Sequence, residues 1–336
     1  LNVRLGVSKD RTKGSSIPQI RAKGRGDSYI IRICTAMVVP SMRAIGPADI
    51  FHEWYSSHWH PWFPEGFKWR QFRFMTFEGV WIKIPRPKRR IRSKTKLASI
   101  IRSIAPKHAF YTALKFLDPS TLGPREVPAY CLGGDLVFDI DVLSDPTRIA
   151  TDQYRVAANY TLQLTDILRE LGYEDFFIVF TGFKGFHLHV PNFDPYEFLG
   201  IQPSEILRTE AEIKARKQIA ELITSKNIPI DQEVTRDIKR IVRLPDTLHG
   251  KTGLLALVLD NVQVSKIQED PQCLKHMSIP NWFRENVRVH IISPKIKRVI
   301  LFDEIHEISE GSTNVPLIVA LIIGLNDLAE RLKILL

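Results

Sequence analysis

Two carboxylates stand two residues apart in a predicted core strand, LVFDID, at residues 136–141. Because side chains alternate along a strand, Asp139 and Asp141 share one face while the opposite face is apolar. At a separation of about 4 Å and an effective dielectric constant of about 20, the two charges repel by about 4 kcal/mol. A structural pair with basic partners, a general acid–base dyad and a divalent-metal site are three explanations of this pattern. Mg²⁺ or Mn²⁺ suits carboxylate oxygens and removes the repulsion.

A glycine-containing turn follows the next predicted strand, in the segment FTGFKGFHLHV at residues 180–190. Gly182 and Gly185 allow a tight turn and a close approach of a ligand to the backbone. Around this turn lie a hydroxyl, an ammonium and an imidazole, on Thr181, Lys184 and His187. This set suits phosphate oxygens, although an ordinary hairpin is the alternative. His189 shares a strand face with His187, and we expect it to pack or to support the site from behind.

A third group of polar residues lies in IDQEVTRDIKRIVRLPDTLHGKTGL, at residues 230–254. Asp231 and Asp237 are candidates for a third carboxylate. Cationic or protonatable groups follow, on Arg243, His249 and Lys251. Each could instead be a surface residue near a turn, because Pro245 and Gly250 indicate turns here. Taken together, the three segments supply acids for metal and donors for a triphosphate, the combination used in two-metal phosphoryl transfer.

Composition limits the classes of protein that need to be considered. The chain has 336 residues and a net charge of +10, with a pI of about 9.5, which favours polyanionic partners. Its three cysteines are far apart and indicate neither a disulfide framework nor a zinc motif, as in a reducing cytosol. The most apolar run, residues 315–325, is too short to span a bilayer. Eight Lys and Arg residues without an acid occupy residues 83–96, either as a solvated loop or as a contact to nucleic-acid phosphate.

Hydrophobic periodicity predicts an α/β chain with one sheet covered by helices on one face. The predicted elements are a helix at 48–59, a hairpin within 69–85, a helix at 151–171 with Asp152 as its N-cap, strands at 176–180 and 186–190, and a helix at 204–226. We expect a flexible basic leader at 1–40, one catalytic domain at 41–310 and an amphipathic C-terminal helix at 311–336 that packs on it. Met37 and Met42 precede the first predicted helix and are candidate translation starts.

The three segments GGDLVFDIDV, FTGFKGFHLHV and VTRDIKRIVRLPDTLHGKTGL, in this order, resemble the small, catalytic subunit of archaeal and eukaryotic DNA primase, and the archaeal form most. FHEWYSSHW resembles the first helix of that family, and WRQF resembles its Arg-Glu-Phe strand, with Gln71 in place of the glutamate. The likeness extends from about Ile50 to Val258. It implies the archaeo-eukaryotic primase catalytic fold, an α/β fold with a mixed sheet, and not a Rossmann or helicase fold.

The resemblance also implies roles for individual residues. Asp139 and Asp141 match the paired aspartates that bind two Mg²⁺ or Mn²⁺ ions. The third metal ligand would be Asp231, which precedes the matching His249 by eighteen residues (249 minus 231). Asp237, at the start of a predicted helical turn and its continuation, would have a structural, helix-capping role. The residues that match nucleotide-binding positions are Thr181, Lys184, His187, Arg243, His249 and Lys251.

Two differences from the family pattern affect these expectations. Thr181 and Lys184 stand where the family has Ser and Arg, and lysine lacks the bidentate fork of arginine. Many archaeal relatives insert a cysteine-rich zinc module after the paired aspartates, whereas here residues 145–151 lead directly into a helix without a cysteine. We therefore expect no structural zinc. The iron–sulfur cluster of the family belongs to the large subunit, and we expect none in this chain.

The function implied by the resemblance is templated synthesis of short primers from NTPs on single-stranded DNA, with extension by dNTPs left open. The implied partners are the primase large subunit, as a heterodimer, the single-stranded DNA template and NTPs, with no membrane. The expected location is cytoplasmic and associated with the nucleoid. The alternatives are a primase–polymerase of a plasmid or repair system that makes DNA directly, and a non-catalytic nucleic-acid-binding subunit.

Overall fold

The structure, a computed structural model, describes residues 20–23, 28–31, 44–87, 90–123, 130–142 and 145–336. The chain divides into two compact units, Leu1–Arg43 and Ala44–Leu336. In the first unit, strands β1 (Ile20–Lys23) and β2 (Ser28–Ile31) pair antiparallel. The remainder of the predicted leader at residues 1–40 lies outside the described residues.

The second unit is an α/β domain, which confirms the predicted fold class. Its helices are α1 (Pro47–Ser57), α2 (Lys94–Ile104), α3 (Thr151–Glu170), α4 (Pro195–Leu199), α5 (Arg208–Ser225), α6 (Gln232–Arg236), α7 (Asn261–Glu269), α8 (Gln272–Ser278) and α9 (Leu317–Leu325). Its strands are β3 (Ala44–Ile45), β4 (Phe72–Met75), β5 (Trp81–Ile84), β6 (His108–Thr112), β7 (Leu114–Phe116), β8 (Cys131–Asp141), β9 (Arg148–Ile149), β10 (Phe177–Phe180), β11 (Gly185–Phe193), β12 (Ile241–Arg243), β13 (Leu257–Leu259), β14 (Asn286–Pro294), β15 (Arg298–Leu301), β16 (Glu304–Glu307), β17 (Gly311–Pro316) and β18 (Ala329–Leu335).

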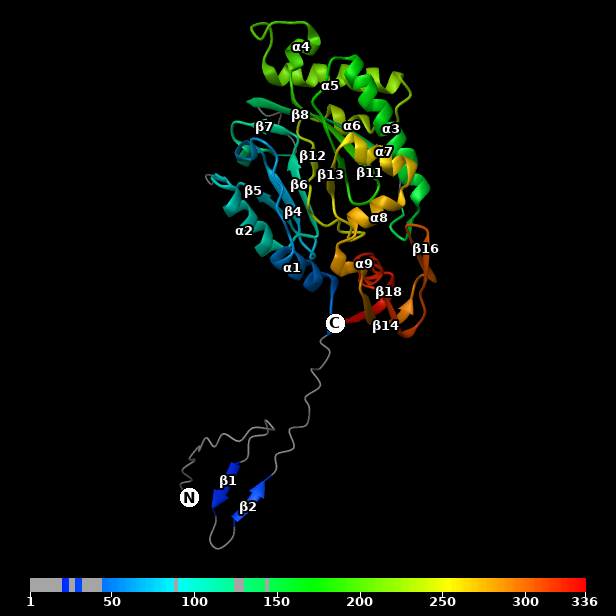
Figure 1. Ribbon diagram of the computed structural model, residues 1–336. Helices are drawn as coiled ribbons and strands as arrows, with labels where there is room; N and C mark the ends of the chain where they lie inside the picture. The colour runs from blue at the N-terminus through cyan, green and yellow to red at the C-terminus, as the bar shows by residue number, and fades with distance from the viewer. Residues whose placement is uncertain (1–19, 24–27, 32–43, 88–89, 124–129, 143–144) are drawn as a thin grey trace. The chain divides into compact units, whose positions relative to one another are not determined.

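Two antiparallel sheets carry the residues predicted to form the site. The first has the strand order β13-β10-β11-β8-β7 and the second β12-β6-β4-β5. They meet where β6 continues, after one residue, into β7. Helices α3, α5 and α6 contact the first sheet and α7 packs on α3, whereas α1 and α2 lie beside the second sheet (Figure 1). Among the described strands, parallel pairing is confined to β9 with β15, in the small sheet β16-β15-β9.

Alternation along β8 separates the core from the site. Phe138 and Ile140 are fully buried in the hydrophobic core, as are Phe186 and Leu188 on the neighbouring strand β11. Complete burial of an apolar side chain of this size contributes about 1.5–3 kcal/mol. These residues therefore fix which face of β8 is turned away from the core, and with it the direction in which its acids point.

Helix α3 ends where the sequence predicts, but its N-terminus is capped by a different residue from the one predicted. The predicted N-cap, Asp152, is wrong: the N-cap is Ala150, whose side chain accepts no hydrogen bond. The carboxylate of Asp303 takes over this role from the turn between β15 and β16, where it accepts the backbone N–H (3.2 Å) and the hydroxyl of Thr151. The helix ends before Gly172, as predicted, and this glycine has a φ of +88°.

The prediction of one amphipathic helix at residues 311–336 is wrong. This segment forms β17, α9 and β18, and both strands pair with β14. Eight of the nine residues of α9 are buried, because its sequence, LIVALIIGL, has no polar face. The predicted boundary at residue 310 is therefore not a domain boundary, since β18 also pairs with β3 near the start of the compact unit. None of the described helices combines the length and hydrophobicity that a membrane crossing requires.

Candidate active site

An open pocket of about 200 Å³ lies where the two sheets approach each other. Strands β8 and β11 contribute side chains from the first sheet, and β6 and β12 from the second. The pocket is lined by eight of the nine predicted site residues: Asp139, Asp141, Thr181, Lys184, His187, Arg243, His249 and Lys251. Three segments that are distant in the sequence thus meet at one place.

The pairing of β8 with β11 places the acids beside the glycine turn. Asp139 lies opposite His187, and Asp141 lies opposite Gly185. A Cβ atom on Gly185 would be 1.9 Å from the carbonyl oxygen of Ile140, so the strands can approach this closely only with glycine at that position. The second glycine of the motif is therefore required by the strand pairing that forms the site.

The two strand carboxylates are difficult to ionise without a positive partner. Burial, followed by the charge of Asp231, raises the pKa of Asp139 to about 6, and burial with the charge of Asp139 raises the pKa of Asp141 to about 6. Asp139 Oδ1 is buried and has no hydrogen-bond partner among the described residues. Lys184 Nζ lies 3.3 Å from Asp141 Oδ2 and offsets only part of the repulsion. This pair of oxygen donors fits a divalent cation.

Asp231 lies next to Asp139, but its carboxylate is turned to other partners. Its backbone N–H donates to the carbonyl oxygen of Asp139 at 2.9 Å. Its Oδ1 accepts the N–H of Glu233 at 3.0 Å and so caps α6, while Oδ2 is 3.9 Å from Arg240 Nη2. Asp231 does not line the pocket, and no set of three or more His, Cys, Asp or Glu side chains arranged for a metal ion occurs in the described part of the chain.

The predicted helix after Asp237 is wrong, and so is its role as the N-terminal cap. Helix α6 precedes this residue and ends at Arg236, whereas residues 241–243 form strand β12. The Asp237 carboxylate accepts the N–H of Lys239 at 2.8 Å in the turn that connects them. The β-branched pair Ile241 and Val242 favours a strand once it can pair with β6.

The glycine turn is held from two sides. Gly182 has a φ of +84°, and a Cβ there would be 2.8 Å from Cβ of His249. The Tyr154 hydroxyl on α3 donates to the carbonyl oxygen of Phe183 at 2.7 Å. The Thr252 hydroxyl donates to the carbonyl oxygen of Gly182 at 2.6 Å. These contacts fix the turn that presents Thr181 and Lys184 to the pocket.

Two histidines in the pocket are neutral. Burial, followed by the charges of Arg243 and His108, lowers the pKa of His249 well below its usual range. His249 Nδ1 accepts the N–H of Lys251 at 3.3 Å, which leaves the proton on Nε2. Burial and then His189 lower the pKa of His187 to about 3. The 3.4 Å approach of its Nε2 to Asp139 Oδ1 is therefore not an ion pair.

Sequence reasoning missed part of the pocket wall. Phe110 and Arg240 line the pocket, and His108 lies directly behind it. Both Nη atoms of Arg243 are 3.2 Å from Nδ1 of His108, and its Cζ lies 4.3 Å from the centre of the Phe110 ring. Burial and then Arg243 lower the pKa of His108 to about 2, so this imidazole accepts from the guanidinium. Alternation in KHAFYT would have put His108 and Phe110 on one face, but it could not show which face meets the pocket.

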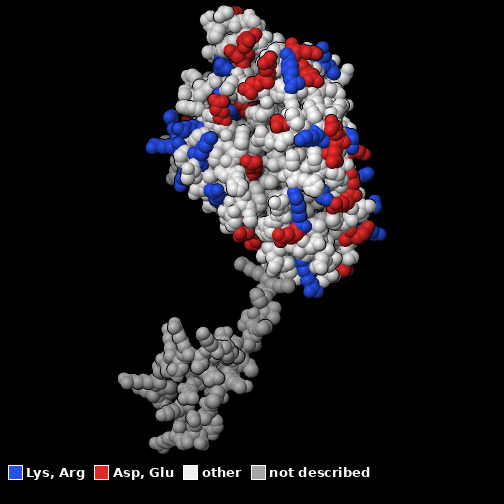
Figure 2. Space-filling view, in the orientation of Figure 1, with Lys and Arg blue, Asp and Glu red and all other residues white. Residues whose placement is uncertain are grey.

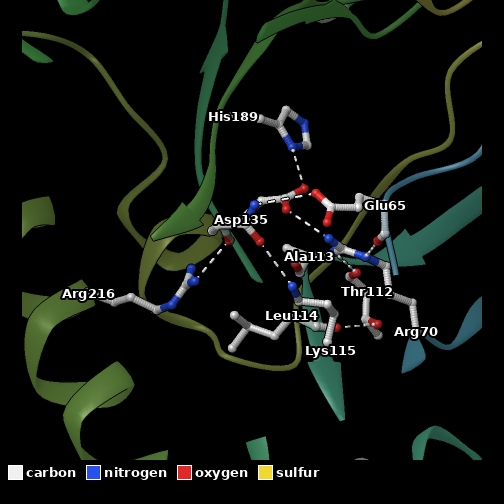
Figure 3. A network of polar contacts seen from close by, with 10 residues as sticks. Glu65, Arg70, Thr112, Ala113, Leu114, Lys115, Asp135, His189 and Arg216 are labelled. Atoms are coloured by element: carbon white, nitrogen blue, oxygen red, sulfur yellow. Dashed lines mark hydrogen bonds and ion pairs between the residues drawn. The ribbon is translucent and has the colours of Figure 1, made fainter. Parts of the chain in front are cut away.

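A buried network of polar contacts holds the other end of the acidic face of β8 (Figure 3). Arg70 Nη2 is 2.8 Å from Asp135 Oδ1, and Nδ1 of His189 is 3.4 Å from Oδ2. Arg70 also donates to the carbonyl oxygens of Thr112 and Ala113, where β6 becomes β7. From α5, Arg216 donates to the carbonyl oxygen of Asp135 at 2.8 Å. The network ties β8 to the junction of β6 and β7 and to α5, and His189 is packed in it, fully buried.

The fold and the pocket define an α/β protein in which two strand carboxylates lie next to basic, imidazole and hydroxyl side chains. The sequence profile of the DNA primase small subunit matches residues 138–260. The DNA primase small subunit of Pyrobaculum islandicum is 28% identical over 233 residues, which is 59% of this chain and 72% of the relative. That of Archaeoglobus fulgidus is 26% identical over 63% of this chain and 79% of the relative, and that of Thermoplasma acidophilum is 25% identical over 75% and 89%.

Residues 138–260 of the chain are thus similar to the DNA primase small-subunit family, and the relatives it matches are archaeal members of that family. This confirms the resemblance seen in the three sequence segments. A solved structure, the polymerase domain of Mycobacterium tuberculosis Ligase D in complex with DNA, covers 68% of this chain and 86% of its own, with a TM-score of 0.42 and 13% identity. A likeness at that level adds nothing to the assignment.

Proposed function

We propose that this chain is the catalytic subunit of a DNA primase, which synthesises short primers from NTPs on single-stranded DNA. The reaction joins two nucleotides: the 3′-hydroxyl of the first attacks the α-phosphate of the second, a phosphodiester bond forms and pyrophosphate leaves. The observation that carries the proposal is the pair of poorly neutralised carboxylates, buried Asp139 and more exposed Asp141, in one pocket with the phosphate donors.

The carboxylates of Asp139 and Asp141, with Asp231 beside them, are the residues that would hold Mg²⁺ or Mn²⁺. The unpartnered Oδ1 of Asp139 and the raised pKa values of both strand acids support this assignment. Bound divalent cations would neutralise these carboxylates and stabilise negative charge on the reacting phosphate. Neither zinc nor an iron–sulfur cluster is part of the proposal.

The remaining pocket residues would bind and orient the triphosphate. Lys184, Arg243 and Lys251 supply cationic donors, and neutral His249 donates from Nε2. Thr181, on the glycine turn, adds a hydroxyl close to the same place. Because Arg243 is stacked on Phe110 and bound to His108, its guanidinium keeps one orientation, which lowers the entropy lost when a phosphate binds.

The proposed function also requires partner molecules. We expect a heterodimer with a large subunit and a single-stranded DNA template, in the cytoplasm and associated with the nucleoid. The net charge of +10 favours such a polyanionic template.

Incorporation of radiolabelled NTPs on a single-stranded DNA template, with and without Mn²⁺, tests this function. We expect metal-dependent products that are longer than a dinucleotide from the wild type and none from Asp141→Asn. Equal incorporation of dNTPs alone would favour a primase–polymerase. Template binding without incorporation under every metal condition would favour a non-catalytic subunit and overturn the proposal.

A further inference from the structure

One face of the second sheet continues outward from the pocket. The register pairs Arg243 on β12 with Phe110 on β6, and Phe110 with Arg73 on β4. It then pairs Arg73 with Lys83 on the edge strand β5. Directly paired residues of antiparallel strands point to the same side of a sheet. These four side chains therefore form one row across four strands, over about 14 Å at about 4.8 Å per strand.

Arg243 is buried at the pocket end of the row, whereas the other three side chains belong to an exposed surface, which we call the Trp81 face. It consists of Arg73, Met75, Trp81, Lys83 and Phe110. Each of these residues is partly or fully exposed, whereas Phe72, Phe74 and Tyr111, which alternate with them, are completely buried on the other side of the sheet. Trp81 is 48% exposed, which is unusual for the largest apolar side chain. Trp81 adjoins Met75 and Phe110, and contiguous exposed apolar side chains of this kind mark an interaction site.

Two aromatic rings connect the Trp81 face to the pocket. The centre of the Trp81 ring is 5.9 Å from that of Phe110, with 34° between their planes. Phe110 lines the pocket and carries the guanidinium of Arg243 on its ring. Flat rings of this kind are the platforms on which proteins stack the bases of single-stranded nucleic acids, whatever the sequence.

Positive charge accompanies these rings. Lys83 is exposed, and Arg73 is partly exposed with its Nε bound to Gln71 Oε1 at 2.6 Å. Burial lowers the pKa of Arg73, and the negative charge of Asp237, in the turn after α6, offsets part of this effect. Further exposed cations continue from β5 to the start of α2, on Arg86, Arg90, Arg92, Lys94 and Lys96. Figure 2 shows Lys and Arg side chains gathered on the side of the domain where β5 and α2 lie.

We propose that the Trp81 face binds single-stranded DNA next to the pocket, with bases stacked on Trp81 and phosphates contacted by Lys83 and Arg73. The proposal rests on the proposed function, because a template must pass beside the nucleotide that is being added. The three strands of the Trp81 face span about 10 Å, which at the 3.4 Å spacing of a stacked strand accommodates about three phosphates. A protein partner that covered the Trp81 and Phe110 rings would also have to bury the cations on either side of them. A nucleic acid supplies bases for the rings and phosphates for the cations.

The test is the affinity of the full chain for a fluorescent oligothymidylate, measured by anisotropy at several salt concentrations. We expect Trp81→Ala to weaken binding by about tenfold, and Trp81→Phe to retain most of it, because a smaller ring still stacks. Lys83→Gln should reduce the slope of log affinity against log salt by about 0.7. In the incorporation assay, Trp81→Ala should raise the KM for the template and leave the KM for NTP unchanged.

Two matched controls and a folding check make the result decisive. Tyr130→Ala removes an exposed aromatic residue directly before the first residue of β8, and Lys217→Gln removes an exposed charge on α5. Both variants should bind the oligonucleotide as the wild type does. Unchanged melting temperatures show that the variants fold. Wild-type affinity and salt slope in Trp81→Ala and Lys83→Gln would overturn the proposal and leave the face to a protein partner.

Two further outcomes separate this proposal from the proposed function. A loss of affinity for an oligouridylate alone would place RNA on the face and would also overturn the proposal. If the wild type incorporates no nucleotide under any metal condition, the proposed function fails, while the binding measurement still decides the role of the Trp81 face.

Discussion

Asp135 and Asp139 lie four residues apart on the same face of β8, and both are buried, at 4% and 8% exposure. Their surroundings are nevertheless opposite. Burial alone would raise the pKa of Asp135, but Arg70 and His189 outweigh it and lower the pKa. At Asp139, burial and Asp231 outweigh Arg240 and Lys184, and the pKa rises to about 6.

The difference distinguishes a carboxylate that is neutralised within the fold from one that is left poorly neutralised. Asp135 has an arginine at 2.8 Å, and its strand is fixed by Arg216 through the backbone. Asp139 has a buried oxygen without a hydrogen-bond partner in the described residues. Because both carboxylates are buried to a similar extent, the nearby cations decide the direction of each pKa shift. An added positive charge would be needed to neutralise Asp139.

The largest expected effect is a reversal of phenotype between these two acids. Asp135→Asn should destabilise the domain by about 3–5 kcal/mol, because Arg70 is left buried without a counter-charge. Asp139→Asn should not lower the melting temperature of the metal-free protein and should lose metal-dependent nucleotide incorporation by at least about a hundredfold. Thermal unfolding in EDTA and the incorporation assay measure the two effects. A stable, inactive Asp135 variant beside an active Asp139 variant would contradict the comparison.

Asp231 caps α6 in the structure and is also proposed as a metal ligand. Asparagine caps helices about as well as aspartate does, so Asp231→Asn should keep its stability. We expect it to lose catalysis and the binding of Mn²⁺, measured by the paramagnetic resonance of the ion. Asp237→Asn is the matched control and should remain active. An active Asp231→Asn protein would restrict the proposed metal site to the two strand acids.

A smaller effect is expected at the donor side of the pocket. A hydrogen bond to a charged group contributes about 1.5–3 kcal/mol, which corresponds to about a tenfold to hundredfold change in affinity. His187→Ala and Arg243→Ala should weaken NTP binding by this amount and leave the affinity for the template unchanged. Equilibrium dialysis with labelled NTP measures the first quantity and anisotropy the second. A loss of template affinity with a constant KM for NTP would show that the nucleotide lies elsewhere.

The smallest effect is a dependence of stability on pH. The pKa of Asp139 is higher in the folded protein, about 6, than its usual value of 3.8, so the folded state holds more protons between these values. The metal-free protein should therefore lose stability from this group as the pH rises from about 4 to 6. The difference in melting temperature between wild type and Asp139→Asn isolates this group and should shift by a few degrees across that window. A constant difference would indicate an ordinary pKa.

Local sequence patterns predicted the elements that carry the site. The alternation in LVFDID gave β8 and the direction of its acids, and the two glycines located the turn before β11. Both of these features depend on residues close together in the chain, where periodicity and turn chemistry act directly. The meeting of the three distant segments in one pocket was implied by the family resemblance instead.

What the sequence could not predict depends on contacts between distant segments. The start of α3 is capped by Asp303, which is 152 residues away from Thr151. Arg70 and Asp135 form their ion pair across 65 residues, and no local pattern links them. Residues 311–336 were predicted to be one amphipathic helix because the pairing of β17 and β18 with β14, on either side of α9, has no local signal.

A crystal structure of the chain with Mn²⁺ and a non-hydrolysable NTP tests the central claim most directly. The account predicts anomalous density for manganese at the carboxylates of Asp139 and Asp141, and a triphosphate that contacts Lys184, Arg243 and His249. Asp139→Asn under the same conditions should lose the manganese density, while the Asp135–Arg70 pair stays intact. Manganese and nucleotide bound away from this pocket in the wild type would contradict the account.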